Sequence, residues 1–213
     1  MSVKKEQKPL LWENELKYEG CTVCGVDEAG RGPLVGRVYA AAVILPYGER
    51  DNPHILALND SKKLTEKKRD ILAEEIKKLA VSWCVAYSEV FEIEEMNILE
   101  ASLLAMRRAI AGLAVPVDVA LIDGNISRGF PVEAHAIVGG DGISPSIAAA
   151  SILAKTERDR WCMEYLDAKY PEYGFAKHKG YGTKAHYEAI EKYGPCPEHR
   201  MSFLKKFYER YES

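Results

Sequence analysis

Residues 25–45 read GVDEAGRGPLVGRVYAAAVIL and join two adjacent acids to a long apolar stretch. The part from 37 to 45 is apolar on both faces, which is typical of a central strand covered by helices on both sides. Asp27 and Glu28 end the preceding apolar run, and burying two carboxylates is costly unless a cation or hydrogen bonds replace the lost solvation. Gly30 and Gly32 flank Arg31, so an anion can approach the main chain closely while the guanidinium binds it.

Hydrophobic periodicity predicts alternating strands and helices along the rest of the chain. The predicted strands cover 22–26, 37–45, 81–87, 117–122 and 134–138, and the predicted helices cover 65–79, 99–113, 145–170, 183–193 and 202–211. Thr65 and Ser144 are expected N-caps, and Pro145 suits a first helical turn. This order predicts an α/β protein with a mixed sheet and helices on both faces. We expect one domain over 1–213, with a core at about 20–170 and a helical C-terminal part at about 171–213.

Composition limits the kinds of partner and compartment. The 213 residues carry a formal charge of −3, so a polyanion would have to be held by a local basic patch. Residues 1–9 hold three lysines and no apolar leader, and no apolar run reaches the ~18 residues of a membrane helix. Cys21 and Cys24 lack the second pair of a zinc site, so the five cysteines indicate packing residues in a reducing compartment. We therefore expect a cytoplasmic protein without membrane contact.

Four acids fall at or after the ends of predicted strands, where open α/β sheets place their sites. They are Asp27, Glu28, Asp123 and Asp141. If they converge, repulsion between them is relieved by raised pKa values or by divalent cations, and an all-oxygen set suits Mg²⁺ or Mn²⁺. Asp123 followed by Gly124 is alone an ordinary turn signal. Asp27 and Glu28 would point to opposite faces of a regular strand, so both can serve only if the strand is ending there.

Seven sequence blocks resemble those of the type 2 ribonuclease H family, ribonuclease HII. The blocks, in chain order, are GVDEAGRG at 25–32, NDSKKL at 59–64, LIDG at 121–124, GD at 140–141, AASILAK at 149–155, HKGY at 178–181 and HRMSF at 199–203. The resemblance implies a ribonuclease H-like fold with a mixed five-stranded sheet, flanking helices and a small helical C-terminal extension. It also implies hydrolysis of the RNA strand of RNA/DNA hybrids.

The resemblance assigns roles to particular residues. The four acids named above would be the metal-binding and catalytic set, with two Mg²⁺ or Mn²⁺ ions during catalysis. Gly30, Arg31 and Gly32 would contact ribose 2′-hydroxyls through the main chain, and Tyr181 would stack on the deoxyribose beyond the last ribonucleotide. Such a site implies cutting 5′ of single ribonucleotides in duplex DNA, with 3′-hydroxyl and 5′-phosphate ends. We expect a monomer that acts on hybrids and on ribonucleotide-containing duplexes.

Two positions depart from the family pattern, and several basic residues have two interpretations. Gly139 stands where a lysine that contacts phosphate is usual, and Arg37 either compensates for it or is a solvated strand residue. Lys179 and Lys62 are candidate phosphate contacts, although an ordinary basic loop or a solvated helix face would produce the same pattern. Lys155 and Arg158 lie one helical turn apart and could reach a duplex backbone.

Two rival functions remain open. A silent nucleic-acid binding module would bind hybrids without metal-dependent nicking, although the presence of all four acids argues against it. The type 3 ribonuclease H shares the acid motif but usually has a longer N-terminal substrate-binding domain, whereas about 20 residues precede the first predicted strand here.

Overall fold

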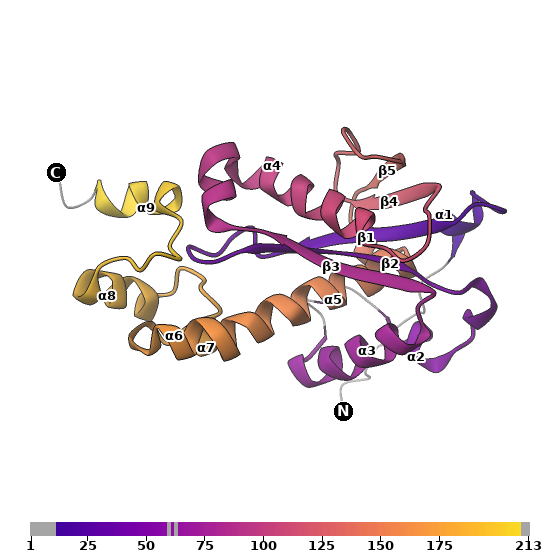
Figure 1. The fold of residues 1–213 in the computed structure, drawn as a ribbon. Helices are drawn as coiled ribbons and strands as arrows, with labels where there is room; N and C mark the ends of the chain where they lie inside the picture. The colour runs from indigo at the N-terminus through magenta and orange to yellow at the C-terminus, as the bar shows by residue number, and fades with distance from the viewer. Residues whose placement is uncertain (1–11, 59–60, 62–63, 210–213) are drawn as a thin grey trace, which may run out of the picture.

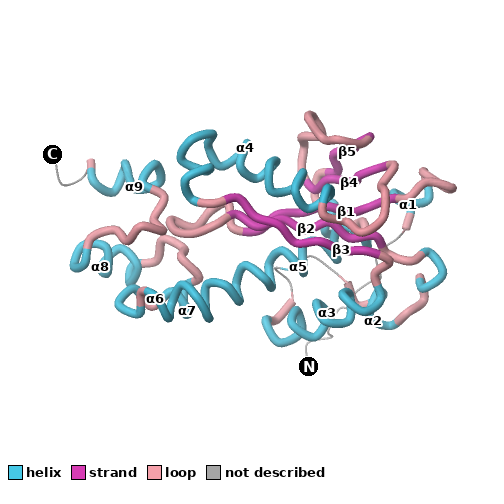
Figure 2. The backbone as a smooth tube through the Cα atoms, in the orientation of Figure 1, coloured by secondary structure: helices cyan, strands magenta, loops and turns pink. Residues whose placement is uncertain are grey.

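The computed structural model describes residues 12–58, 61 and 64–209, and its centre is a five-stranded mixed sheet (Figures 1 and 2). The spatial order is β3-β2-β1-β4-β5; β1 pairs antiparallel with β2 and β2 with β3, whereas β1 with β4 and β4 with β5 are parallel. The strands are β1 (Val23–Ala29), β2 (Val38–Ile44), β3 (Ser82–Ser88), β4 (Val119–Asp123) and β5 (Glu133–Ile137). The predicted mixed five-stranded sheet is confirmed.

Helices cover both faces of this sheet. In Figure 1, α4 lies on one side of the strands, while α3 and α5 lie on the other, and α5 packs directly on β1 and β2. The helices are α1 (Glu13–Leu16), α2 (Pro53–Leu56), α3 (Glu66–Leu79), α4 (Val90–Ala111), α5 (Pro145–Trp161), α6 (Asp167–Lys169), α7 (Phe175–His178), α8 (Lys184–Tyr193) and α9 (Met201–Tyr208). Short 3₁₀ turns occur at η1 (Tyr47–Glu49), η3 (Gly140–Gly142) and η5 (Pro171–Tyr173), and a π-helical segment, η4 (Cys162–Leu166), joins α5 to α6.

Local chemistry explains where α3 and α5 begin. The Thr65 hydroxyl accepts the amide hydrogen of Lys68, and the Ser144 hydroxyl accepts that of Ile147, so both predicted N-caps are confirmed. Gly25 lets α5 lie directly on β1, because a Cβ there would sit 2.1 Å from the backbone carbon of Ser146. The alanines at 148–150 are fully buried against the sheet.

Several element boundaries differ from the sequence prediction, and two of the differences have a clear cause. α4 begins at Val90 rather than near 99, but Asn97 interrupts it with φ of 74° and its side chain accepts the amide hydrogen of Leu99. The predicted start therefore marks a real cap inside a longer helical segment. β1 continues to Ala29, three residues beyond its predicted end, because the hairpin pairing with β2 extends to Ala29 opposite Tyr39.

The C-terminal helices gather at one end of the sheet, beside the connection between β1 and β2 (Figures 1 and 2). Leu34 and Val35 of that connection share a buried cluster with Phe175, Ile190 and Leu204. Apolar burial of this kind joins segments that are distant in the sequence. The chain thus brings its last helices against the glycine-rich loop, residues 30–37.

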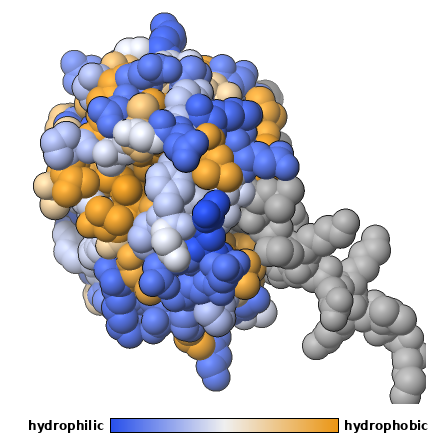
Figure 3. Space-filling view, turned by 90° about the vertical axis from the view of Figure 1, so that its right-hand side faces the viewer, coloured by the Kyte–Doolittle hydropathy of each residue, from blue (hydrophilic) through white to orange (hydrophobic). Residues whose placement is uncertain are grey.

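The surface shows no continuous apolar band on the face drawn in Figure 3, where hydrophobic residues are interspersed among hydrophilic ones. Within the described part of the chain, no helix is both long enough and apolar enough to cross a membrane.

Candidate active site

A cavity of about 320 Å³ lies where β1, the glycine-rich loop, α5 and the turn after α7 meet. Its lining combines two acids, the Gly-Arg-Gly segment, two hydroxyls, a lysine and a tyrosine. The lining residues are Asp27, Glu28, Ala29, Gly30, Arg31, Gly32, Ser61, Ser151, Lys155 and Tyr181. This cavity therefore contains six of the ten residues that the sequence predicts for the site.

Asp27 is the electrostatic centre of the cavity. Its side chain is 5% exposed, and the amide hydrogen of Glu28 binds Oδ1 with a nitrogen–oxygen distance of 2.7 Å. Burial raises the pKa of Asp27 well above its ordinary value, and the nearby carboxylates of Glu28 and Asp123 raise it further. Hydrogen bonding from Ser151 partly opposes that shift. The negative charge of ionised Asp27 is therefore not balanced by these contacts, and a bound cation could balance it.

Both acids of the pair line the cavity although β1 does not end before them. β1 ends one residue after Glu28, so the pair lies in the last three residues of the strand. The strand continues to Ala29, yet Asp27 and Glu28 reach one space, and Glu28 also lies 3.4 Å from the Arg31 guanidinium.

Asp123 is brought beside Asp27 by strand pairing. Val26 of β1 lies opposite Ile122 of β4 in parallel register, so the next residue of each strand is an acid. Asp123 Oδ1 accepts the amide hydrogen of Gly140 at 2.7 Å. Asp141 follows that glycine in η3, so the fourth acid is attached to the segment that Asp123 binds. Neither Asp123 nor Asp141 is among the residues that line the cavity itself.

The predicted metal ligands therefore lie near one another without forming a complete metal-coordination site. Among residues 12–58, 61 and 64–209, no group of three or more histidine, cysteine or acidic side chains is arranged so that it could hold a metal ion. One oxygen of Asp27 and one of Asp123 bind main-chain amides instead. The donors are all oxygens and Asp27 resists ionisation, so their chemistry fits a hard divalent cation.

The Gly-Arg-Gly segment forms one wall of the cavity. Gly30 has φ of +99°, a backbone conformation that favours glycine. Gly32 faces the Tyr181 ring, with 3.6 Å between its would-be Cβ and Cε1. Arg31 is about half exposed. The loop thus presents main chain to the cavity with little side-chain cover.

Tyr181 is 43% exposed and has two cations near its ring. Lys155 Nζ lies 5.7 Å from the ring centroid, and the Arg158 guanidinium carbon lies 5.5 Å from it. Arg158 itself is buried and donates to the Lys179 carbonyl, so it supports the turn rather than reaching solvent. Lys179 Nζ donates to the Ala176 carbonyl and is absent from the cavity lining. Lys62, the other predicted phosphate contact, lies outside the described residues.

Arg200 is a residue that the sequence does not single out beyond its place in the block at 199–203. Its side chain is 0% exposed, and within the described residues every hydrogen bond of its guanidinium goes to a carbonyl of the glycine-rich loop. Burial, together with the Arg158 cation, lowers the pKa of Arg200 to about 9, so the group stays charged at neutral pH. The block at 199–203 was the only available signal for this role.

The two departures from the family pattern have structural accounts. Arg37 forms a bidentate pair with Glu89 at 2.8 and 2.9 Å and lies over the Tyr87 ring, so it is neither a solvated residue nor a lining residue of the cavity. Gly139 has φ of +66°, which is strained for a lysine.

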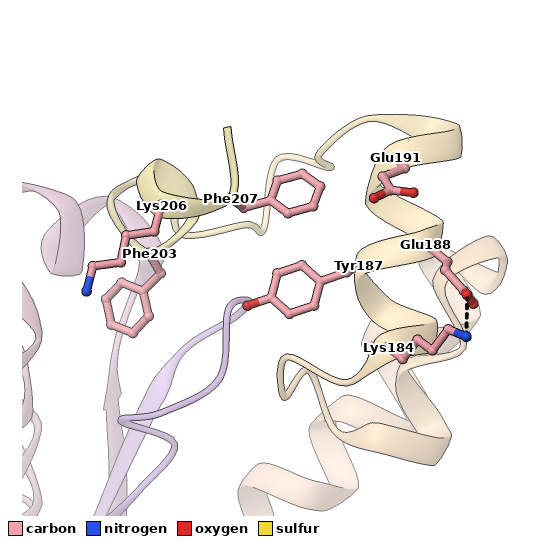
Figure 4. A pocket seen from close by; sticks show the side chains of 7 residues that line it. All are labelled: Lys184, Tyr187, Glu188, Glu191, Phe203, Lys206 and Phe207. Carbon is pink, nitrogen blue, oxygen red and sulfur yellow. Dashed lines mark ion pairs between the residues drawn. The ribbon is translucent and has the colours of Figure 1, made fainter. Parts of the chain in front are cut away.

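A second cavity, of about 560 Å³, lies between α8 and α9 and is more apolar (Figure 4). Tyr187 and Phe207 stack across it with ring centroids 5.2 Å apart, and Lys184 pairs with Glu188 at 3.6 Å. None of the four predicted acids lines it. The chemistry of the site therefore belongs to the smaller cavity.

Comparison with known proteins identifies the family of the chain. The family model described as Ribonuclease HII matches residues 24–206. Ribonuclease HII of Shewanella halifaxensis is 56% identical over 179 residues, which cover 84% of this chain and 86% of that protein. Ribonuclease HII of Shewanella amazonensis is 53% identical over 203 residues, or 95% of each chain.

Solved structures with the same fold include two of the ribonuclease H2 or HII type. Ribonuclease H2 from Pyrococcus horikoshii is 27% identical with a TM-score of 0.72, covering 90% of this chain and 99% of that one. The ribonuclease HII solved in complex with PCNA from Archaeoglobus fulgidus has a TM-score of 0.71 at 27% identity, covering 85% and 93%. The ribonuclease H-like fold is thus confirmed, and the chain belongs to the ribonuclease HII family of endoribonucleases, which hydrolyse RNA in RNA/DNA hybrids.

Proposed function

We propose that this protein is a metal-dependent endonuclease that cuts the RNA strand of RNA/DNA hybrids and nicks 5′ of single ribonucleotides in duplex DNA. The products carry 3′-hydroxyl and 5′-phosphate ends. The observation that carries the proposal is the buried Asp27, whose pKa is raised by burial and by the carboxylates of Glu28 and Asp123, beside a cavity walled by Gly-Arg-Gly. A phosphodiester entering that cavity would meet both acids and bare main chain.

Asp27, Glu28, Asp123 and Asp141 would hold two Mg²⁺ or Mn²⁺ ions. Bound there, the ions would supply an activated water and stabilise the charge on the leaving oxygen. The protein's own contribution is the burial of Asp27, which makes its uncompensated charge unfavourable and so favours cation binding. No histidine lines the cavity, and a histidine base is not part of the proposal.

Substrate selection would come from the opposite wall. The main chain at Gly30, Arg31 and Gly32 would contact the ribose 2′-hydroxyl, which distinguishes RNA from DNA. Tyr181 would stack on the sugar that follows the last ribonucleotide, and Lys155, whose Nζ lies 5.7 Å from the ring centroid, would bring positive charge toward the backbone phosphates. Lys179 and Lys62 remain proposed phosphate contacts. Lys179 would have to leave the Ala176 carbonyl to serve.

A nicking assay on a duplex with one embedded ribonucleotide tests the chemistry. Asp123→Asn should abolish cleavage with Mg²⁺ or Mn²⁺ while it leaves folding and duplex binding intact. Asp118→Asn is a matched control, because Asp118 lies just before β4 and its side chain caps the amide of Thr22. Cleavage by the Asp123 variant at the wild-type rate would refute the proposed metal role.

Two rivals are separated by the same substrates. A binding module without activity would retain duplexes but never nick them with any metal. A ribonuclease of type 3 specificity would cut long hybrids but not a single ribonucleotide. Tyr181→Ala should reduce cutting at single ribonucleotides more than cutting of long hybrids. Equal losses would argue against recognition of the RNA-to-DNA junction by Tyr181.

We also propose that the protein acts as a monomer in the cytoplasm. The five cysteines are all free, which suits a reducing compartment. Size-exclusion chromatography with light scattering would reveal a dimer and so contradict the first part.

A further inference from the structure

Arg200 is buried behind the glycine-rich loop and binds its main chain through hydrogen bonds. A guanidinium has five N–H donors, and each one here has a backbone carbonyl as its acceptor. The five donor–acceptor distances lie between 2.7 and 3.1 Å. The acceptors are the carbonyls of Gly30, Arg31, Pro33, Gly36 and Arg37. One side chain from the C-terminal region thus sets the shape of a loop more than 160 residues earlier in the chain.

This contact sets the direction of two amide hydrogens. In a trans peptide the carbonyl of one residue and the N–H of the next point in opposite directions. The carbonyls of Gly30 and Arg31 point at Arg200, so the N–H groups of Arg31 and Gly32 point away from it. The loop therefore turns two N–H donors away from Arg200, and both belong to residues that line the cavity.

We propose that Arg200 is a positioning residue that sets the preference for ribose by holding the Arg31 and Gly32 amides toward the 2′-hydroxyl. This inference rests on the proposed function, in which the loop contacts that hydroxyl. Arg200 does not touch substrate in this role, because its side chain is fully buried behind the loop. Its effect passes through the main chain of residues 30–37.

The same region holds the second wall of the cavity in place. Leu34 N–H donates to the Gly180 carbonyl at 2.9 Å, and Arg200 N–H donates to the Leu34 carbonyl at 2.8 Å. The turn that carries Tyr181 is therefore tied to the loop that Arg200 shapes. A displaced guanidinium would change the spacing between the two walls as well as the direction of the amides.

Arg200→Lys tests the role because it keeps the charge and removes the planar fork. An ammonium has three donors and cannot satisfy five carbonyls, so the loop loses its fixed shape. The readout is the dissociation constant, measured in EDTA, for two duplexes that differ by a single 2′-hydroxyl. We expect wild-type protein to prefer the ribose duplex by about tenfold, from two oriented hydrogen bonds. In Arg200→Lys that ratio should approach one, while affinity for the all-DNA duplex changes less than twofold.

Two outcomes would overturn the inference. The variant could keep the wild-type ratio, or it could lose affinity for both duplexes equally, which is the result of a merely structural role. A wild-type protein without any ribose preference would instead refute the proposed function. Arg108→Lys is the matched control, because Arg108 also donates to a carbonyl, that of Tyr87, but lies on α4 outside the cavity lining.

A second variant keeps the test decisive if Arg200→Lys does not fold. The Phe203 ring lies 5.2 Å from the Arg200 guanidinium, so Phe203→Leu loosens the arginine without removing it. We expect this variant to lower the ribose-to-deoxyribose ratio partway. A ratio equal to that of wild type would contradict the role of Arg200.

Discussion

Alanine at position 32 should impair substrate access without affecting folding. The φ of Gly32 lies outside the left-handed region, and an added Cβ would meet only Tyr181 Cε1, at 3.6 Å, which is an ordinary contact. The free energy of unfolding should therefore change by less than about 0.5 kcal/mol. The added methyl nevertheless occupies the space between the loop and the Tyr181 ring, where the sugar would approach the main chain.

The expected kinetic effect follows because the sugar can no longer approach the main chain at residue 32. Losing one or two hydrogen bonds to the 2′-hydroxyl, at about 0.5–1.5 kcal/mol each, lowers kcat/KM by a factor of about 2 to 150, and by about tenfold at the middle of that range. Gly30→Ala should behave differently, because its φ of +99° costs an alanine about 1–2 kcal/mol. Its Cβ would also lie 3.1 Å from both Arg158 Nε and the Arg37 carbonyl oxygen. Crowding of this kind adds about 1–3 kcal/mol.

Urea unfolding and cleavage of a single-ribonucleotide duplex, measured on the same preparations, distinguish the two glycines. Gly48→Ala serves as the control, because an added Cβ there meets nothing within 4 Å and its φ is not in the left-handed region. The reasoning is refuted if Gly32→Ala cleaves as wild type does. A loss of stability in Gly32→Ala as large as that in Gly30→Ala would refute it equally.

Three further predictions concern charge. Because burial raises the pKa of Asp27, the metal-free protein loses stability as pH rises through that pKa. The Asp27→Asn variant should therefore be more stable than wild type at pH 7. Adding Mg²⁺ at 100 times its Kd should raise the Tm of wild type by about 5–10 °C and leave the Tm of the variant unchanged. Burial lowers the pKa of His186 and His199 to about 4, so the unfolded chain binds more protons between that pH and about 6.5. Urea unfolding should therefore show the free energy of unfolding decreasing as pH is lowered from about 6.5 to about 4, by up to about 3 kcal/mol per histidine, with a smaller decrease in His199→Gln. Arg37→Met, which breaks the pair with Glu89, should cost about 1 kcal/mol in the same assay and leave cleavage unchanged, whereas a loss of cleavage would contradict its structural role.

Much of the fold was predictable because its signals are local. A hydroxyl at Thr65 or Ser144 caps a helix whatever lies elsewhere, and an apolar run such as residues 38–44 needs cover on both faces. The end of β1 was not predictable in the same way. Its last three residues are strand because β2 pairs with them, so the boundary depends on the partner strand.

The amino-acid sequence alone determined which side chains are costly to bury and which loop lacks side chains, and these properties placed Asp27, Glu28 and Gly-Arg-Gly in one site. Tertiary structure alone decided which distant residues meet them. Asp123 reaches Asp27 through the register of β1 with β4, and Arg200 reaches the loop through packing of the C-terminal helices. Register and packing depend on burial summed over the whole molecule, so no local pattern around Arg200 could reveal that its guanidinium holds five carbonyls.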